Sequence, residues 1–326
     1  MGRGMLRRRV WTAGLGLALA IMFSNARVTR AQMPAKNPAK TPADDAQHKA
    51  ALAAIKSWRE GSDVEVKLSG PEPTFDKDLL ARGKKTYNDR CAFCHGEQGD
   101  GNGKDAHGLS PQPRDFTKGL YEFRSTPSGA LPTDLDIFTV VTKGLHGTGM
   151  VPWIALSERD RWAVVAYVEQ FSPRFAHEPR PAAIEVPKAP EVTPAMVAEG
   201  HKLFVASGCP ECHGPGGHAD GPKAASLVDS DGRQINLLDF ARGVFRRGSN
   251  LEDFFLTIRT GLNGTPMPGY EKSLSVDQTW AVAAYVQSLI ATPGGTPEGR
   301  ALAEKARDQE TVGVKLDFPG MAEPGK

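Results

Sequence analysis

Two copies of one five-residue pattern contain all four cysteines of the chain. Residues Cys91–His95 and Cys209–His213 both read Cys-x-x-Cys-His. Cysteines three positions apart share one helical turn, where both thiols can bond the two vinyl groups of a haem. The histidine after the second cysteine is placed to bind the iron from one face. The pattern predicts two covalently bound haem c groups, attached through Cys91, Cys94, Cys209 and Cys212 and ligated by His95 and His213.

Other uses of these cysteines fit the spacing less well. Two Cys-x-x-Cys pairs can form a zinc site, but zinc ribbons usually separate their pairs by about 15–20 residues. Here each pair lies in its own half of the chain and has its own histidine. A thioredoxin-like redox motif needs a neighbouring βαβ pattern, which neither copy offers. Two disulfides would suit an exported chain, but the haem pattern already uses every thiol.

A methionine follows each motif at nearly the same distance and is a candidate for the second iron ligand. Met150 follows His95, Met267 follows His213 with a spacing only one position shorter, and both belong to a Gly-Thr-x-Met sequence. A thioether sulfur is a soft ligand that favours ferrous iron and suits electron transfer. Methionine is also common core filler. The competing histidines are interpreted as ordinary surface or loop residues: His107, His146 and His218.

The elements that must position these residues are repeated as well. The segments before the motifs, the Gly-Thr-x-Met sequences and two Trp-containing segments recur at a nearly constant offset, so the chain contains a duplicated domain. The first copy spans 76–172 and the second 194–291. Each is near the size that folds alone, and a haem would add to its apolar core. Between them, the proline-rich residues 173–193 predict an extended, semi-rigid linker without helix or sheet.

Each copy is predicted to be helical. Gly83 precedes Tyr87 by one turn, and Gly200 precedes Phe204 likewise. This spacing would let a second helix approach at the glycine. A closing helix is expected after Ser157 and after Ser275, since both begin sequences that resemble capping boxes. Its aromatic residues are interpreted as core, with Gly- and Pro-rich loops wrapping the cofactor. The fold class is therefore all-α.

The chain ends carry different signals. Residues 1–31 combine a basic start, a short apolar run and small residues, which is typical of a secretory signal peptide and predicts a periplasmic protein. The apolar run is shorter than the roughly 20 residues of a spanning helix, so membrane attachment is expected only if this segment is retained. Residues 32–75 are interpreted as a partly disordered lead-in, although 46–58 have helical composition without an assigned role. Residues 292–326 form a tail.

The charge balance argues against some partners. The chain has 40 Lys+Arg and 38 Asp+Glu; removal of residues 1–31 takes away six arginines, leaving 34 against 38 and a net charge of −4. The basic residues are scattered, without a stripe or an interleaved aromatic platform, so nucleic acid is not an expected partner. The mild negative charge favours a partner contact with charge complementarity.

With these motifs in place, both halves resemble class I cytochrome c domains, and the tandem is similar to dihaem cytochromes of the c4 type. The resemblance covers both repeated segments through the Cys-x-x-Cys-His motif, the preceding Gly-x-x-x-aromatic helix, the Gly-Thr-x-Met sequence and the closing helix. It implies two small helical folds, each with one haem in a crevice. The linker, the chain ends and an insertion-like loop over 113–132 depart from the pattern and leave the domain orientation open.

Arginines between the haem motifs and the methionines are candidates for contacts with haem propionates. Guanidinium groups pair well with carboxylates, and such charges help to set a reduction potential. Arg124 and Arg246 are assigned this role as a hypothesis. The alternative is that both are solvated surface arginines.

The predicted function is electron transfer: a periplasmic carrier or relay that takes single electrons from a donor protein and passes them to an acceptor such as a respiratory oxidoreductase or terminal oxidase. No small-molecule substrate and no catalytic residue are expected. A fixed cytochrome subunit of a larger respiratory oxidoreductase is the alternative. A dihaem peroxidase would need an open distal position, which two matching methionines disfavour. A sulfur-compound dehydrogenase would need a further cysteine, and the sequence has none to spare.

Overall fold

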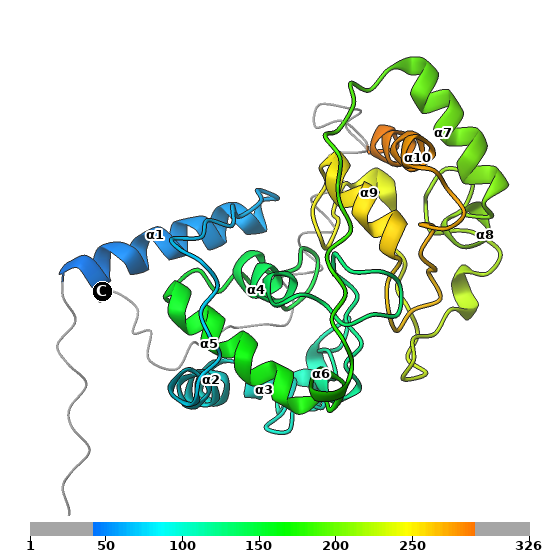
Figure 1. Cartoon of the computed structure of the whole chain (residues 1–326). Helices are drawn as coiled ribbons and strands as arrows, with labels where there is room; N and C mark the ends of the chain where they lie inside the picture. The colour runs from blue at the N-terminus through cyan, green and yellow to red at the C-terminus, as the bar shows by residue number, and fades with distance from the viewer. Residues whose placement is uncertain (1–41, 291–326) are drawn as a thin grey trace, which may run out of the picture. The chain divides into compact units, whose positions relative to one another are not determined.

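The computed structural model describes residues 42–290, and within this range every regular element is helical (Figure 1). The predicted signal peptide and the predicted tail lie outside the described residues. A single isolated bridge, between Val228 and Gln234, is the one β-type contact found in the described range. The all-α prediction is confirmed. The described residues all belong to one compact unit that begins at Pro42.

The first domain is organised around a close crossing of two helices, α2 (Lys77–Arg90) and α5 (Glu158–Val168). At the crossing, a Cβ atom on Gly83 would lie 1.9 Å from the carbonyl oxygen of Ala163, so only glycine fits there. Two further helices complete the domain: α3 (Ala92–His95) and α4 (Asp134–Lys143). The approach predicted at Gly83 is confirmed.

The second domain repeats this arrangement with α7 (Pro194–Ala206) and α10 (Val276–Ser288) as the crossing pair. A Cβ atom on Gly200 would lie 1.9 Å from the carbonyl oxygen of Ala281. In Figure 1, α9 lies beside α10, with which it packs. The remaining helices are α8 (Pro210–His213) and α9 (Leu251–Thr260). The duplication seen in the sequence is therefore also a duplication of helix packing.

The closing helices begin where their caps require. The side chain of Ser157 accepts a hydrogen bond from the amide of Asp160, and α5 starts at Glu158. Ser275 and Gln278 form a reciprocal capping box at the start of α10. Such bonds satisfy amides that have no partner inside the helix. Both predicted helix starts are confirmed.

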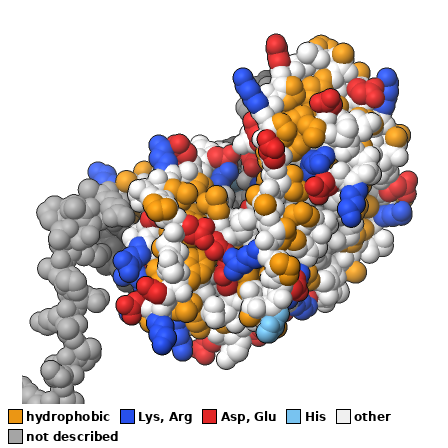
Figure 2. Space-filling view, viewed as in Figure 1, with side chains coloured by type: hydrophobic (Ala, Val, Ile, Leu, Met, Phe, Trp, Pro, Cys, Tyr) orange, Lys and Arg blue, Asp and Glu red, His pale blue; other side chains and the backbone are white. Residues whose placement is uncertain are grey.

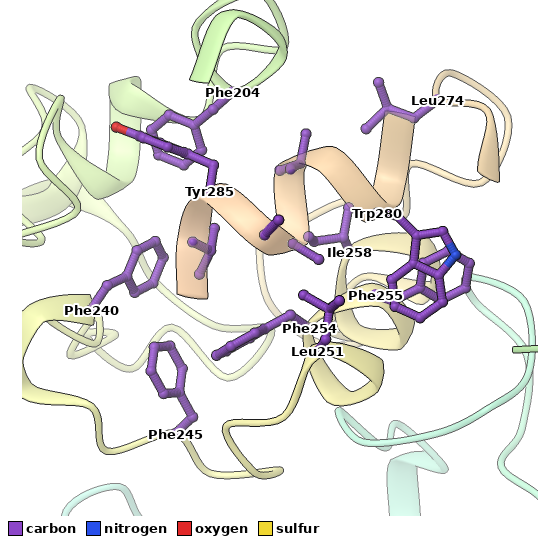
Figure 3. Close-up of a cluster of buried hydrophobic side chains, with 14 residues drawn as sticks. Phe204, Phe240, Phe245, Leu251, Phe254, Phe255, Ile258, Leu274, Trp280 and Tyr285 are labelled. Atoms are coloured by element: carbon purple, nitrogen blue, oxygen red, sulfur yellow. The ribbon is translucent and has the colours of Figure 1, made fainter. Parts of the chain in front are cut away.

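A stacked tryptophan and phenylalanine join the closing helix to its neighbour in each domain. Figure 3 shows Trp280 of α10 against Phe255 of α9, with ring centroids 4.0 Å apart. In the first domain Trp162 of α5 stacks on Phe138 of α4 at 4.1 Å. Both tryptophans are almost completely buried. The interpretation of these aromatics as core is correct, and they hold α4 and α9 in place.

The proline-rich linker differs from its prediction in one place. Helix α6 (Arg174–His177) occupies a stretch that was expected to be free of helix. The chain has no proline between Pro173 and Pro179. Nothing therefore removes the amides that one helical turn needs. Beyond α6, the amide of Ile184 donates to the carbonyl of Ser125 at 2.7 Å, which anchors the linker to the first domain.

Helix α1 (Pro42–Arg59) precedes the first domain and includes the segment 46–58 of helical composition. Its residues Ala51 and Trp58 are each only 5% exposed, so one side of the helix packs against protein. Farther along, the carboxylate of Glu158 accepts bonds from both the amide and the hydroxyl of Ser69. Trp58 and Ser69, which belong to the predicted lead-in over 32–75, thus both contact the first domain. No helix in residues 42–290 combines the length and apolarity needed to cross a membrane.

Candidate functional site

Two short helices, α3 and α8, build the Cys-x-x-Cys-His motifs into single turns. The amide of His95 donates to the carbonyl of Cys91 at 2.9 Å, and that of His213 donates to Cys209 at 3.0 Å. Each turn ends at a glycine with positive φ. A side chain would disfavour that conformation. This geometry places the first thiol and the imidazole one turn apart, as the predicted haem attachment requires. None of the four cysteines forms a disulfide.

The second domain contains an apolar cavity of about 210 Å³ that brings its predicted site residues together. Its lining includes both thiols of the motif, the histidine and the methionine: Cys209, Cys212, His213 and Met267. Aromatic side chains form much of the remaining wall, among them Phe240, Phe245 and Phe254, which Figure 3 shows facing one another. A largely apolar cavity with few polar groups is what a haem needs. The residues present therefore fit this cofactor.

In the first domain, the first cysteine of the motif and the methionine belong to one hydrophobic cluster. Cys91 and Met150 both pack against a buried core that includes Tyr87 and Phe138. The hydroxyl of Tyr87 donates to the carbonyl of Gly96, directly after the motif, at 2.8 Å. The cysteine and the methionine, which are far apart in the sequence, thus meet on the same core.

Both motif histidines are held in a state that suits an iron ligand. Desolvation lowers the pKa of His95 to about 4 and the pKa of His213 to about 4, so both imidazoles are neutral at ordinary pH. Nδ1 of His95 lies 3.2 Å from the carbonyl oxygen of Arg114. This carbonyl can accept a hydrogen bond from Nδ1 and leave Nε2 for iron. Within the described residues, Nδ1 of His213 has no hydrogen-bond partner.

A phenylalanine packs against each motif histidine, stacked on His95 and tilted against His213, and the sequence reasoning missed both. The ring centroids of Phe116 and His95 are 4.5 Å apart, and those of Phe240 and His213 are 4.7 Å apart. Each begins a 3₁₀ turn capped by the preceding aspartate, Asp115 or Asp239. The available signal was the repeated sequence Asp-Phe-x-Lys/Arg-Gly. It was overlooked because the spacing of its two copies departs from the otherwise nearly constant offset.

The two methionine loops have the same internal hydrogen bonds. The amide of Leu145 donates to the carbonyl of Met150 at 2.8 Å, and that of Leu262 donates to Met267 at 3.1 Å. In each loop the threonine hydroxyl accepts from the methionine amide, at 3.0 Å from Thr148 and 3.2 Å from Thr265. The Gly-Thr-x-Met sequence therefore encodes one loop shape, which fixes the methionine backbone in both domains.

The two predicted propionate arginines have different surroundings. Arg246 lines the cavity of the second domain, lies 3.6 Å from Glu122, and has a buried Nε without a partner among the described residues. Arg124 is fully buried, and all three of its nitrogens donate to backbone carbonyls. The alternative interpretation of Arg124 as a solvated surface residue is therefore wrong. Its propionate contact stays a prediction and would compete with these bonds.

The three histidines considered as competitors for iron, His107, His146 and His218, lie in loops or short turns. His107 is exposed, and His218 is exposed with Nδ1 3.1 Å from Asp239. The ring of His146 stacks on Trp58, with centroids 4.8 Å apart, and its Nε2 lies 3.1 Å from Oδ1 of Asp63. The chain before the first domain thus packs on the loop that carries Met150.

We expect this contact to weaken in acid. The hydrogen bond from His146 holds the pKa of Asp63 below its ordinary value of 3.8. A carboxyl whose pKa is lowered on folding stabilises the fold above its unfolded pKa, and the contribution is lost as the pH falls through the folded pKa. Trp58 fluorescence, followed on acidification past the ordinary Asp value, should report release from His146. In Asp63→Asn the release should already be present at neutral pH and lose its acid dependence; an unchanged profile would contradict the prediction.

The cysteine pairs belong to two separate domains, and no group of three or more His, Cys, Asp or Glu side chains converges on a metal-ion site within residues 42–290.

Acidic and basic side chains are interspersed on the face shown in Figure 2. The whole sequence likewise has nearly equal totals of basic and acidic residues, 40 Lys+Arg and 38 Asp+Glu.

Comparisons with known proteins give one family match in each half of the chain. Residues 78–168 match the family described as cytochrome c oxidase, cbb3-type, subunit III, and residues 197–289 match the family described as cytochrome c. A solved chain from the Kuenenia stuttgartiensis reducing HAO-like protein complex is 38% identical, with a TM-score of 0.64. The match covers 68% of this chain and 100% of that one. No curated protein matches.

Proposed function

Since this chain belongs to the dihaem c-type cytochromes, with two tandem cytochrome c domains that each carry one covalently bound haem c, we propose that it relays single electrons between two redox proteins. Cytochrome c domains transfer electrons and exchange them with redox partners. The bound haems supply the one-electron Fe(III)/Fe(II) couple.

The paired ligand set is the observation that carries the proposal. In the second domain, His213 and Met267 line the same cavity. In the first domain, Met150 joins the core cluster that also holds Cys91, while His95 is held by Phe116 and a carbonyl. We propose that His213 with Met267, and His95 with Met150, would each supply two ligands to one haem iron. Such a site leaves no position for a substrate and changes little on electron transfer, which suits a relay.

Arg246 is the better candidate of the two arginines for a propionate contact. It lines the cavity, and its nearest carboxylate, Glu122, is also bound by Arg114, so the positive charge around Glu122 exceeds the negative. The buried Nε of Arg246 has no partner among the described residues. A partly buried guanidinium with an unpartnered Nε favours an additional anionic partner. We propose that a propionate of the second haem supplies it.

Substitution of the methionines tests the ligand assignment. In the intact protein we expect low-spin EPR signals and no binding of carbon monoxide to either reduced haem. Met267→Ala and Met150→Ala should each open one iron, so that one haem of each variant binds carbon monoxide and its reduction potential falls by part of the about 0.8 V range set by axial ligands. An intact protein that binds carbon monoxide at one haem would favour a peroxidase-like site instead.

A fixed subunit of a larger oxidoreductase is the second candidate function. It is favoured by the relative that matches over its entire length, because that chain was solved as part of a protein complex. The two candidates use the same haem chemistry and differ in partnership. Affinity purification of the full-length protein from its native cells separates them: a stoichiometric catalytic subunit supports the fixed subunit, and a monomeric cytochrome supports the carrier.

We also propose that the protein works in the periplasm and that residues 1–31 are removed on export. The composition of this segment supports the proposal. N-terminal sequencing and the intact mass of the exported protein test it together, since they report both the cleavage point and the presence of two haems. Retention of residue 1 in the exported protein would indicate a membrane anchor.

A further inference from the structure

The distal loop of the second domain is held by residues of the first domain. We propose that Arg124 and the 129–130 backbone position the iron-binding sulfur of Met267, so that the first domain sets the ligand strength and potential of the second haem. The inference rests on the proposed role of Met267 as an axial ligand. The "Met267 loop" denotes residues 261–269, between the end of α9 and the residue after Pro268.

Arg124 binds the end of the helix that leads into this loop. Helix α9 ends at Thr260. The last carbonyls of a helix have no partner within it, and a cation at this end is also favoured by the helix dipole. Nη2 of Arg124 donates to the carbonyl of Thr260 at 2.6 Å, and Nη1 donates to that of Gly261 at 3.3 Å. Because Arg124 is fully buried, water does not compete for these bonds.

Asn263 supplies a second attachment, inside the Met267 loop itself. Its Oδ1 accepts from the amide of Gly129 at 2.9 Å, and its Nδ2 donates to the carbonyl of Ala130 at 3.0 Å. The residue is 8% exposed, so both ends of its amide are satisfied away from solvent. One accepted and one donated hydrogen bond fix both the position and the orientation of the Asn263 side chain. They thereby hold the loop backbone four residues before Met267.

The second domain in turn binds the backbone of Arg124. Both terminal nitrogens of Arg247 donate to the carbonyl of Arg124, at 3.1 and 3.2 Å. A Cβ atom on Gly269 would lie only 3.0 Å from Cβ of Ser128, so the far end of the loop also packs closely on the first domain. The loop is therefore constrained at its start, its middle and its end by residues 124–130.

The equivalent position in the Met150 loop also contacts residues outside that loop. Asn263 occupies the place that His146 occupies in the Met150 loop. His146 contacts Trp58 and Asp63, which precede its domain, whereas Asn263 contacts the domain before its own. Each distal loop is thus supported by chain that lies on its N-terminal side. Functional sites demand placement to within about 0.5 Å, which short internal loop bonds alone do not guarantee.

The test uses the full-length protein with both haems and measures the two midpoint potentials optically. Asn263→Ala and Arg124→Gln should each lower one potential, that of the haem which Met267→Ala identifies, and leave the other unchanged. A tenfold loss of preference for ferrous iron would appear as a shift of about 59 mV. The same haem should begin to bind carbon monoxide, and amide hydrogen exchange should accelerate at Leu262 and Thr265, whose bonds close the loop.

Two variants serve as controls. Arg82→Gln removes an exposed ion pair with Asp160 and should leave both potentials unchanged. His146→Ala should affect the first haem and spare the second. If Arg124→Gln fails to fold, Asn263→Ala carries the test by itself, since it removes only two hydrogen bonds.

The outcomes separate this inference from the ligand assignment. Unchanged potentials in a folded Asn263→Ala variant would overturn the positioning role, provided that Met267→Ala opens the iron. If Met267→Ala itself changes neither the spectrum nor carbon monoxide binding, the proposed ligand is wrong and the inference falls with it. A change in unfolding temperature without a change restricted to one haem would indicate a purely structural role and would likewise overturn the inference.

Discussion

Replacement of Gly200 by alanine should destabilise the second domain by about 3 kcal/mol, at the upper end of the usual cost of overpacking. The new Cβ atom would lie 1.9 Å from the carbonyl oxygen of Ala281 and 2.9 Å from Cβ of Tyr285, so α7 and α10 must move apart. Alanine gains about 1 kcal/mol in helix propensity over glycine, but this gain is smaller than the steric cost. Thermal unfolding, followed by circular dichroism and by haem absorbance, measures the effect.

The first domain offers the matching test and the control. Gly83→Ala should cost a similar amount, because its Cβ would meet the carbonyl oxygen of Ala163 at the same distance. In Gly108→Ala, by contrast, the new methyl group would have no atom within 4 Å. This control should change stability by no more than about 0.5 kcal/mol, the usual range for a surface substitution. If Gly200→Ala melts like Gly108→Ala, the close helix crossing is not a requirement of the fold.

Truncation of Trp280 to alanine should have the other large effect, a loss of about 3–5 kcal/mol, as is usual for a large buried aromatic. Trp280 is 3% exposed and stacks on Phe255, which is itself fully buried (Figure 3). The cavity left behind would release α9 from α10. Since α9 leads into the Met267 loop, we expect the second haem to lose Met267, its proposed distal ligand, before the domain unfolds.

Trp280→Phe separates the loss of volume from the loss of the stack. It keeps an aromatic ring against Phe255 and should cost clearly less than Trp280→Ala. Denaturant unfolding gives the free energies, and carbon monoxide binding to the reduced protein reports the distal ligand. A Trp280→Ala variant that unfolds like Trp280→Phe would show that the stack is not what holds α9.

Several features could be predicted because neighbouring residues alone decide them. One turn of helix brings Cys91 within reach of His95, and a hydroxyl followed three residues later by a polar side chain starts a helix at Ser275. The crossing glycines were also visible, since a glycine one turn before a buried aromatic occurs in both copies. In each case, residues that are close in the sequence are also close in space.

Other features could not be predicted because they join residues that are distant in the sequence. The loop over 113–132 has no periodicity, and its prolines and glycines indicate only an irregular path. Nothing in that path shows that Arg124 becomes fully buried against Thr260, or that Asn263 bonds to Gly129. Helix α1 had a recognisable composition, but its contact with His146 depends on how the following chain returns to the first domain.

The sequence by itself determined the chemistry of this protein: two covalent haems, the motif histidines, the matched methionines and the duplicated helical frame. Only the tertiary structure decided which segment supports each methionine loop, with Trp58 and Asp63 beside one loop and residues 124–130 beside the other. The physical reason is the range of the interactions. Attachment and capping depend on bonds within about one helical turn, whereas support of a loop depends on burial and hydrogen bonds that form only after the chain has folded back on itself.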